Sequence, residues 1–299
     1  MLPFITRKIG VKVSLTVNAF ILVVMLVGTY FLVAQQSRSL EAELLSRGKI
    51  QSIVGAKMIG QTIEEAIDNG VFSVTDAFDT DYEMIGNFDP PKFHTKYDFY
   101  MDKAILALQD EFLLDESIIF AVTVDRNGYL PTHNTRYQNP ITGDPAKDKV
   151  GNRTKRVFND PVGLKAAQNE EKGLLQTYYR DTGEIMWDVS SPIYVKGKHW
   201  GGFRIGISLD VINAAKKQLM ITLVIIMSSI LALSLLLTFI IVNRSMTPLR
   251  RMTAIATELA NGKNLQDEIV VTREDEIGEL QHTLNRLRLS MMIALKRKG

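Results

Sequence analysis

Two long uncharged segments constrain the fold of this chain more than any other feature. Val13 to Ala34 and Leu219 to Val242 contain no Asp, Glu, Lys or Arg. A helix of roughly 20 apolar residues crosses a hydrocarbon core of about 30 Å. A core helix of a soluble protein is usually shorter and polar on one side. We therefore predict transmembrane helices at residues 13–34 and 219–242.

The first segment could instead be a secretory signal peptide. Its apolar run exceeds the roughly 7–15 residues of a signal-peptide apolar region. The residues that follow it, "QQSRSLEAELL", contain no convincing small-x-small cleavage pattern. We expect an uncleaved anchor.

Basic residues indicate the orientation of both segments. They precede the first and follow the second, at Arg7, Lys8, Lys12, Arg244, Arg250 and Arg251. The positive-inside rule then predicts that both termini are cytoplasmic and that residues 35–218 are exported. Lys216 and Lys217 lie on the exported side and count against this orientation, but the two cytoplasmic flanks outnumber them.

Composition excludes several function classes. The formal net charge of +2 provides no global basic field, so we expect no nucleic-acid partner. The absence of cysteine excludes thiol catalysis, zinc–thiolate sites, iron–sulfur clusters and c-type haem attachment. Walker, HExxH and nucleophile-turn motifs are also absent. We expect no enzyme activity, no catalytic residue, no cofactor and no metal site.

The exported segment predicts an α+β fold. Apolar residues recur at steps of three and four from residue 35 to 68 and again from Lys96 to Leu114, as in helices. A β-branched run then precedes an Asn127-Gly128 turn, which is typical of a hairpin. Three further strands follow within residues 174–209, separated by turns at 181–183 and 196–198. Helices before an antiparallel sheet are an α+β order.

This segment resembles the Cache family of extracytoplasmic sensors, of the single-Cache type with a PAS-like sheet. The resemblance lies in the Asn127-Gly128 hairpin and in "DVSSPIYVKGKHWGGFRIGISL", where Pro192-Ile193 enters one strand and "GGFRIG" forms the next. It implies a small-molecule pocket between the sheet and the connecting loops, in a bacterial protein of the inner membrane with the sensor on the periplasmic or extracellular side.

Several polar and aromatic residues are candidates for this pocket. Arg153 or Arg156 in "GNRTKRVFND" could clamp a carboxylate, which would make the ligand an anion, or could pair with nearby aspartates on the surface. His133 is more typical of a structural hydrogen bond or a ligand contact than of a metal site. Large aromatics in strands either pack the core or wall a pocket. The candidates are His133, Asn134, Tyr137, Arg153, Arg156, Tyr179, Arg180 and Trp187.

The segment after the second span carries two short heptad patterns. The first contains Leu249, Met252, Ala256 and Leu259, and the second contains Ile277, Leu280, Leu284, Leu287 and Met291. Two such helices cannot bury their apolar seams alone, whereas two copies can form a parallel four-helix bundle. With Pro248, Gly262 and "DEIGEL", this segment resembles a HAMP domain, which implies a homodimer. The expected relay residues are Pro248, Leu249, Met252, Leu259, Gly262, Glu276, Ile277, Leu280, Leu284 and Leu287.

These elements predict a two-pass receptor for signal transduction. The expected parts are an N-terminal tail (1–12), a first span (13–34), a Cache-like sensor domain (35–218), a second span (219–242), a HAMP domain (243–295) and a C-terminal tail (296–299). One interpretation is a receptor that drives a separate cytoplasmic kinase or chemotaxis component. A second is the sensory half of a methyl-accepting chemotaxis protein or histidine kinase. A third, a transporter or membrane enzyme, is disfavoured because neither span contains a charge.

Overall fold

The computed structural model describes residues 9–296 and divides into two compact units. One contains residues 33–219, and the other contains residues 9–32 and 220–296. Residues 1–8 of the expected N-terminal tail, with Arg7 and Lys8, lie outside the described residues, as do 297–299 of the expected C-terminal tail.

Long helices contribute to both units, and the shorter elements belong to the unit of residues 33–219. The long helices are α2 (Ile9–Asp68) and α8 (Leu209–Ala260), and α9 (Glu276–Lys296) follows them. The short helices are α3 (Val74–Ala77), α4 (Asp98–Ala104), α5 (Leu106–Glu111), η1 (Phe112–Leu114), η2 (Thr135–Tyr137), α6 (Pro145–Gly151) and α7 (Pro161–Ala167). The strands are β1 (Glu83–Met84), β2 (Phe93–His94), β3 (Ile118–Asp125), β4 (Tyr129–Leu130), β5 (Arg156–Val157), β6 (Leu174–Tyr179), β7 (Ile185–Val195) and β8 (Lys198–Ser208).

The centre of the first unit is a four-stranded antiparallel sheet. Its strand order is β3-β8-β7-β6, and β1-β2 and β4-β5 form two small additional pairs. The mixed α+β prediction is confirmed, with long apolar helices before and after the sheet domain. The three strands expected between residues 174 and 209 are β6, β7 and β8. The single helix expected from Lys96 to Leu114 is instead broken at Ile105, whose backbone leaves helical φ and whose side chain is fully buried.

The hairpin expected at Asn127-Gly128 is wrong, although a turn is present there. Gly128 has φ +85° and donates to the carbonyl of Asp125 at 3.0 Å. However, β4 pairs with β5 and not with β3. Side-chain amides occupy the outer edge of β3: Gln109 Oε1 accepts from the N–H of Thr123 at 2.9 Å, and Asn134 Oδ1 accepts from that of Ala121 at 3.0 Å. These bonds satisfy the donors that a second strand would use.

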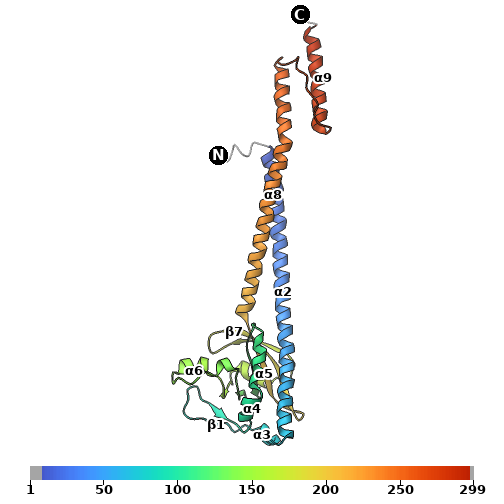
Figure 1. Cartoon of the computed structure of the whole chain (residues 1–299). Coiled ribbons are helices and arrows are strands. Elements are labelled where there is room, and N and C mark those ends of the chain that lie inside the picture. Colours follow the sequence, from blue (N-terminus) through green and yellow to red (C-terminus); the bar gives the residue numbers. More distant parts are fainter. Residues whose placement is uncertain (1–8, 297–299) are drawn as a thin grey trace. The chain divides into compact units, whose positions relative to one another are not determined.

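The part of α2 that belongs to the unit of residues 33–219 covers one face of the sheet. Leu44, Ala56, Ile59 and Ile63 share an apolar core with residues of β3, β7 and β8, and α4 and α5 contribute to the same core (Figure 1). Small residues allow this close approach. A Cβ on Gly55 would lie 2.2 Å from the ring of Phe203, which only glycine avoids. We call this side of the sheet the helix face.

The other side of the sheet carries a smaller core, and we call it the cavity face. Phe120, Val122 and Val124 alternate along β3 toward this side, as the period of two of a strand requires. They meet Leu130 of β4, together with Phe158, Ala167, Tyr178 and Met186. The candidate site lies within this core.

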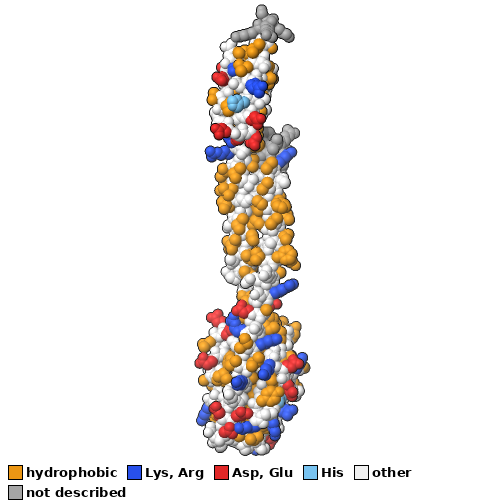
Figure 2. Space-filling view, turned by 90° about the vertical axis from the view of Figure 1, so that its right-hand side faces the viewer, with side chains coloured by type: hydrophobic (Ala, Val, Ile, Leu, Met, Phe, Trp, Pro, Cys, Tyr) orange, Lys and Arg blue, Asp and Glu red, His pale blue; other side chains and the backbone are white. Residues whose placement is uncertain are grey.

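The second unit contains the apolar parts of α2 and α8. Both helices are long and apolar enough to cross a membrane, with mean hydropathy of 2.3 and 2.7 in their most apolar windows. Figure 2 shows hydrophobic and uncharged side chains over this stretch. Within this unit, Ser234 Oγ of α8 donates to Asn18 Oδ1 of α2 at 3.0 Å, and Asn18 is buried. Asn18 Nδ2 also donates to the carbonyl of Ser14 at 2.8 Å, so the amide is satisfied within the apolar stretch.

The same unit contains the segment with heptad spacing. The helix start expected near Pro248 is wrong, because α8 continues through this proline to Ala260. The proline costs one backbone hydrogen bond, and the turns around it maintain the helix. Gly262, at φ +72°, ends α8 in a Schellman motif, with Lys263 N–H bonded to the carbonyl of Glu258 at 2.9 Å and Gly262 N–H to that of Leu259 at 2.9 Å.

The connector from residue 261 to 275 lies along α9. Asp275 caps the helix by accepting from the N–H of Ile277 at 3.1 Å. Arg288 Nη1 of α9 donates to the carbonyl of Leu265 at 3.1 Å, and Gln281 Oε1 accepts from the N–H of Thr272 at 3.0 Å. Met252, Leu259 and Ile269 are buried, whereas Leu287 is 51% exposed. Part of the apolar seam is therefore free to meet a further helix.

Candidate ligand-binding site

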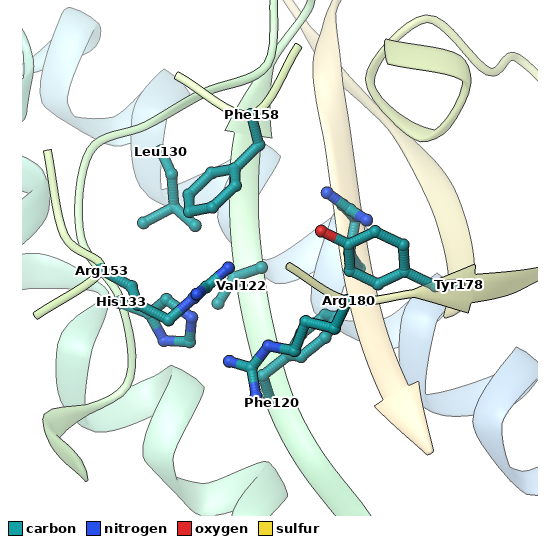
Figure 3. Close-up of a pocket in the computed structure, with 9 residues that line it drawn as sticks. Phe120, Val122, Leu130, His133, Arg153, Phe158, Tyr178 and Arg180 are labelled. Atoms are coloured by element: carbon teal, nitrogen blue, oxygen red, sulfur yellow. The ribbon is translucent and has the colours of Figure 1, made fainter. Parts of the chain in front are cut away.

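A small cavity lies on the cavity face of the sheet. Its volume is about 20 Å³, which is room for about one water molecule. The wall combines aromatic and aliphatic side chains with three arginines and a histidine. The lining residues are Phe120, Val122, Leu130, His133, Arg153, Phe158, Tyr178, Arg180 and Arg204 (Figure 3).

Two parts of the fold supply these residues. The sheet contributes Phe120 and Val122 from β3, Arg204 from β8 and Tyr178 from β6, with Arg180 just beyond the end of β6. The remaining wall comes from the segment of residues 130–158, which we call the loop wall. Figure 3 shows Arg153 and His133 of the loop wall on one side of the cavity, and Tyr178 and Arg180 on the other.

The arginines have unequal carboxylate partners. Arg153 Nη2 lies 2.8 Å from Asp181 Oδ1, and Arg204 Nε donates to Asp188 Oδ2 at 3.0 Å. Arg156, just behind Arg153, lies 3.6 Å from Asp181 as well. Its pKa is lowered to about 10 by burial first and by Arg153 next. One aspartate therefore serves two guanidinium groups, and the cluster has a surplus of positive charge.

Arg180 provides the clearest unused donor of the cavity. Its side chain is buried, with the residue only 6% exposed. Nη1 donates to Glu184 Oε2 at 2.7 Å and to the Tyr137 hydroxyl at 3.2 Å. Nη2 has no hydrogen-bond partner among the described residues. A buried cationic donor without an acceptor is costly, and an anion in the cavity would satisfy it.

His133 supplies a neutral donor. Its Nδ1 accepts the N–H of Asn134 at 2.8 Å, so the ring proton of the neutral form lies on Nε2. Burial lowers the pKa of His133 well below its usual value, and the guanidinium groups of Arg153, Arg180, Arg136 and Arg156 lower it further. Near neutral pH the ring therefore carries no charge and can donate from Nε2 to an anion.

The structure brings together some of the candidate residues from the sequence and separates others. His133, Arg153 and Arg180 line the cavity. Tyr137 and Arg156 lie directly behind it, through Arg180 and Asp181 respectively. Asn134 is fully buried in a structural role at the edge of β3, where it bonds Ala121 and the carbonyl of Gln109.

Tyr179 and Trp187 do not line the cavity. They belong to the helix face, since Trp187 packs against the core under α2 and Tyr179 is 72% exposed. Their neighbour Tyr178 lines the cavity instead, because successive residues of a strand point to opposite faces. The sequence identifies β6 but leaves open which of the two tyrosines faces inward.

Arg204 lines the cavity but is not among the residues predicted from the sequence. It lies in "GGFRIG", between Phe203 and Ile205, which both belong to the helix-face core. Arg204 is the one charged residue in the otherwise mostly apolar stretch of residues 200–208, and this is the signal that could have identified it. Phe120, Val122, Leu130 and Phe158 carry no comparable signal, because core and pocket residues have the same composition.

Among residues 9–296, no cluster of three or more His, Asp or Glu side chains is placed to hold a metal ion. The polar groups that line the cavity are donors from arginine, histidine and tyrosine. This set suits an anion and not a cation.

Comparison with known proteins identifies one domain. The family model of the HAMP domain matches residues 240–291. No curated protein matches the chain.

Three solved structures show partial similarity. The E. coli DcuS sensor domain is 21% identical, covering 38% of this chain and 73% of that one with a TM-score of 0.29. An extracellular ligand binding receptor from Desulfohalobium retbaense DSM5692 is 14% identical, and the match covers 61% of this chain and 25% of that one with a TM-score of 0.34. The sensory domain of the Campylobacter jejuni chemoreceptor Tlp3 (CcmL) is 12% identical, and the match covers 59% of this chain and 65% of that one with a TM-score of 0.28.

Residues 240–291 thus form a HAMP domain. Two helices that can span a membrane flank a separate mixed α+β unit, and the HAMP domain includes the end of the second. The chain has the organisation of a transmembrane sensory receptor.

Proposed function

We propose that this receptor senses a small carboxylate, of about two to four carbons, in the cavity on the cavity face. The observation that carries the proposal is the buried, unpartnered Nη2 of Arg180. Arg153, Arg204 and His133 line the same cavity. A planar carboxylate can accept two parallel bonds from a guanidinium group, which gives both affinity and orientation.

The small volume of the cavity supports a coupling between binding and movement. About 20 Å³ holds one water but not a carboxylate, so a ligand must push the loop wall away from the sheet or draw the two walls into a new packing. Arg204 belongs to β8, and α8 begins directly after β8 ends at Ser208. A shift of β8 is therefore passed along the chain into the second span and then into the HAMP domain.

The proposal also includes the finer parts of the assignment. The sensor is of the Cache type, and the parts have the boundaries predicted from the sequence. The termini lie in the cytoplasm, the sensor lies outside the inner membrane, and two copies form a HAMP bundle through the relay residues predicted above. The protein is a receptor and not an enzyme, and a separate kinase or chemotaxis component receives the signal. The alternative is the sensory half of a chemotaxis receptor or histidine kinase.

Ligand-dependent thermal unfolding tests this function. The full chain in lipid nanodiscs is heated with acetate, lactate, pyruvate, malonate or succinate, with sodium chloride at equal ionic strength as the control. We expect at least one carboxylate to raise the unfolding temperature in a saturable manner. If every carboxylate acts like chloride, the cavity is not a carboxylate site.

A further inference from the structure

The loop wall departs from strand geometry at one point that decides where its arginines lie. Arg156 and Phe158 face the cavity side, and Val157 packs against the opposite core. Regular alternation would place Arg153 on the side of Val157, because both numbers are odd. Instead Arg153 lines the cavity, and the guanidinium carbons of Arg153 and Arg156 lie 5.0 and 4.9 Å from the ring centre of Phe158.

The regular alternation of side chains between the two sides is interrupted at Lys155. This residue has φ +61°, in the left-handed region that residues other than glycine rarely adopt. A turn at Thr154 and Lys155 reverses the alternation between Arg153 and Arg156. Such strain persists only where surrounding contacts impose it.

The contacts that impose it lie on the side away from the cavity. Lys155 Nζ is 3.0 Å from Asp98 Oδ2 and 2.7 Å from Asp102 Oδ2, both on α4. Asp98 is fully buried and also accepts from the Tyr129 hydroxyl at 3.0 Å. The ammonium group lies 5.7 Å from the ring centre of Phe99. A glycine would relieve the strained φ but would lose this anchor.

Backbone bonds hold the same residue from both sides. Lys155 N–H donates to the carbonyl of Leu130 at 3.0 Å, and its own carbonyl accepts from the N–H of Phe93 at 2.9 Å. Leu130 itself lines the cavity. The turn is thus bonded to β4 and β2, and the side chain anchors it to α4.

We propose that Lys155 is a positioning residue of the carboxylate site. It does not touch the ligand. Its left-handed turn places Arg153 and Arg156 on one side, and its ion pairs with Asp98 and Asp102 hold that turn in place. This inference rests on the proposed function for its effect on affinity, whereas its effect on the arginines can be measured without any ligand.

Arginine modification tests the placement directly. The full chain in nanodiscs is treated with phenylglyoxal, and modified arginines are mapped by mass spectrometry. Arg153 and Arg204 are 2% and 3% exposed, so both are protected in the native chain. We expect Lys155→Gly to speed modification of Arg153 and Arg156 about tenfold, through local opening of the loop wall, while Arg204 stays protected. Unchanged protection of Arg153, or equal exposure of all three arginines, would overturn the proposal.

Acetate affinity provides the second measurement, by titration calorimetry on the same samples. Lys155→Gly should weaken acetate binding about tenfold, and the milder Asp102→Asn about threefold, because each removes part of the anchor. Lys155→Arg, which can still reach both carboxylates, should restore binding. Lys165→Met, an exposed lysine on α7, is the matched control.

The two experiments fail in different ways. If native protein does not bind acetate but Lys155→Gly exposes Arg153 selectively, the positioning role stands and acetate is not the ligand. If native protein binds acetate and Lys155→Gly binds it equally well, the positioning role is wrong and the carboxylate site stands.

Discussion

The two faces of the central sheet differ in what their side chains do. On the helix face, apolar residues of β7 and β8 meet α2 at such short range that Gly55 leaves no room for a Cβ against Phe203. On the cavity face, the same strands present Arg204 and Asp188 as a buried ion pair, beside the unpartnered Nη2 of Arg180. In each strand, the residues that point to the helix face pack the apolar core, and the alternate residues that point to the cavity face supply charged groups.

Neighbouring residues show this division most clearly. Phe203 and Arg204 are adjacent in β8, and Tyr178 and Tyr179 are adjacent in β6, yet the members of each pair have opposite surroundings. The comparison teaches that substitutions on the helix face should change the free energy of unfolding, whereas substitutions around the cavity should change ligand affinity. The following substitutions test that separation.

The largest effect is expected for Phe203→Ala on the helix face. Phe203 is fully buried and contacts α2, so its removal leaves a cavity and should cost about 3–5 kcal/mol of unfolding free energy. Thermal unfolding of the full chain in nanodiscs measures this loss. Acetate affinity of the chain that stays folded at low temperature should not change; a large loss of affinity would show that the faces are not independent.

On the cavity face, Arg180→Gln should act on binding. It removes the unpartnered donor and the positive charge, and should weaken carboxylate binding by about 10–100-fold, since a charge-assisted bond contributes about 1.5–3 kcal/mol. Its partner Glu184 is partly exposed and can be solvated, so the unfolding temperature should fall by little. Titration calorimetry and thermal unfolding on one sample separate the two. A collapse of stability with affinity unchanged would reverse the assignment of this face.

A pH effect should follow from His133. Its folded-state pKa lies below the unfolded value of about 6.5, so the unfolded chain binds more protons under acidic conditions. Stability due to the neutral ring is therefore complete above pH 6.5 and is lost as pH falls, by up to about 1.4 kcal/mol per pH unit. Comparison of native and His133→Gln chains between pH 7.5 and 5.5 isolates this contribution. Parallel pH profiles for the two chains would contradict it.

The smallest effect is expected for Tyr179→Ala. This side chain is 72% exposed and lies on the face away from the cavity, so the unfolding free energy should change by less than about 0.5 kcal/mol and acetate affinity not at all. Tyr178→Ala, one residue earlier, is the matched variant and should alter affinity. If Tyr179→Ala weakens binding as strongly as Tyr178→Ala, the strand is not oriented as described.

The sequence predicts the elements of this molecule better than their pairing. Uncharged length identifies the apolar stretches of α2 and α8, and turn residues locate the ends of β6, β7 and β8. The false hairpin arose because Gln109 and Asn134, distant in sequence from most of β3, satisfy its outer edge. Local patterns carry no information on such side-chain partners. The sequence also predicts a helix start near Pro248, where α8 in fact continues. The helical turns on both sides of this proline maintain the helix although proline disfavours it locally.

The candidate site was predictable in its charge and not in its geometry. The sequence indicates Arg153 by the basic loop that contains it, His133 by its place at the end of a strand, and Arg180 by its place among the later strands, and all three line the cavity. Tyr179 is predicted as an aromatic pocket wall, but Tyr178 lines the cavity, because strand alternation alone does not show which of two adjacent residues faces inward. The position of Arg153 depends on the single left-handed residue Lys155, which no propensity scale would assign to a lysine.

The measurement that tests the account most directly is the response of the HAMP domain to a carboxylate. The chain has no native cysteine, so a single cysteine in place of Ser290 on α9 can carry a spin label in each copy. Pulsed electron resonance in nanodiscs then gives the distance between the two labels. We predict that acetate changes this distance in the native background and not in Arg180→Gln. The same distance with and without acetate in the native background, or the same change in both backgrounds, would contradict the account.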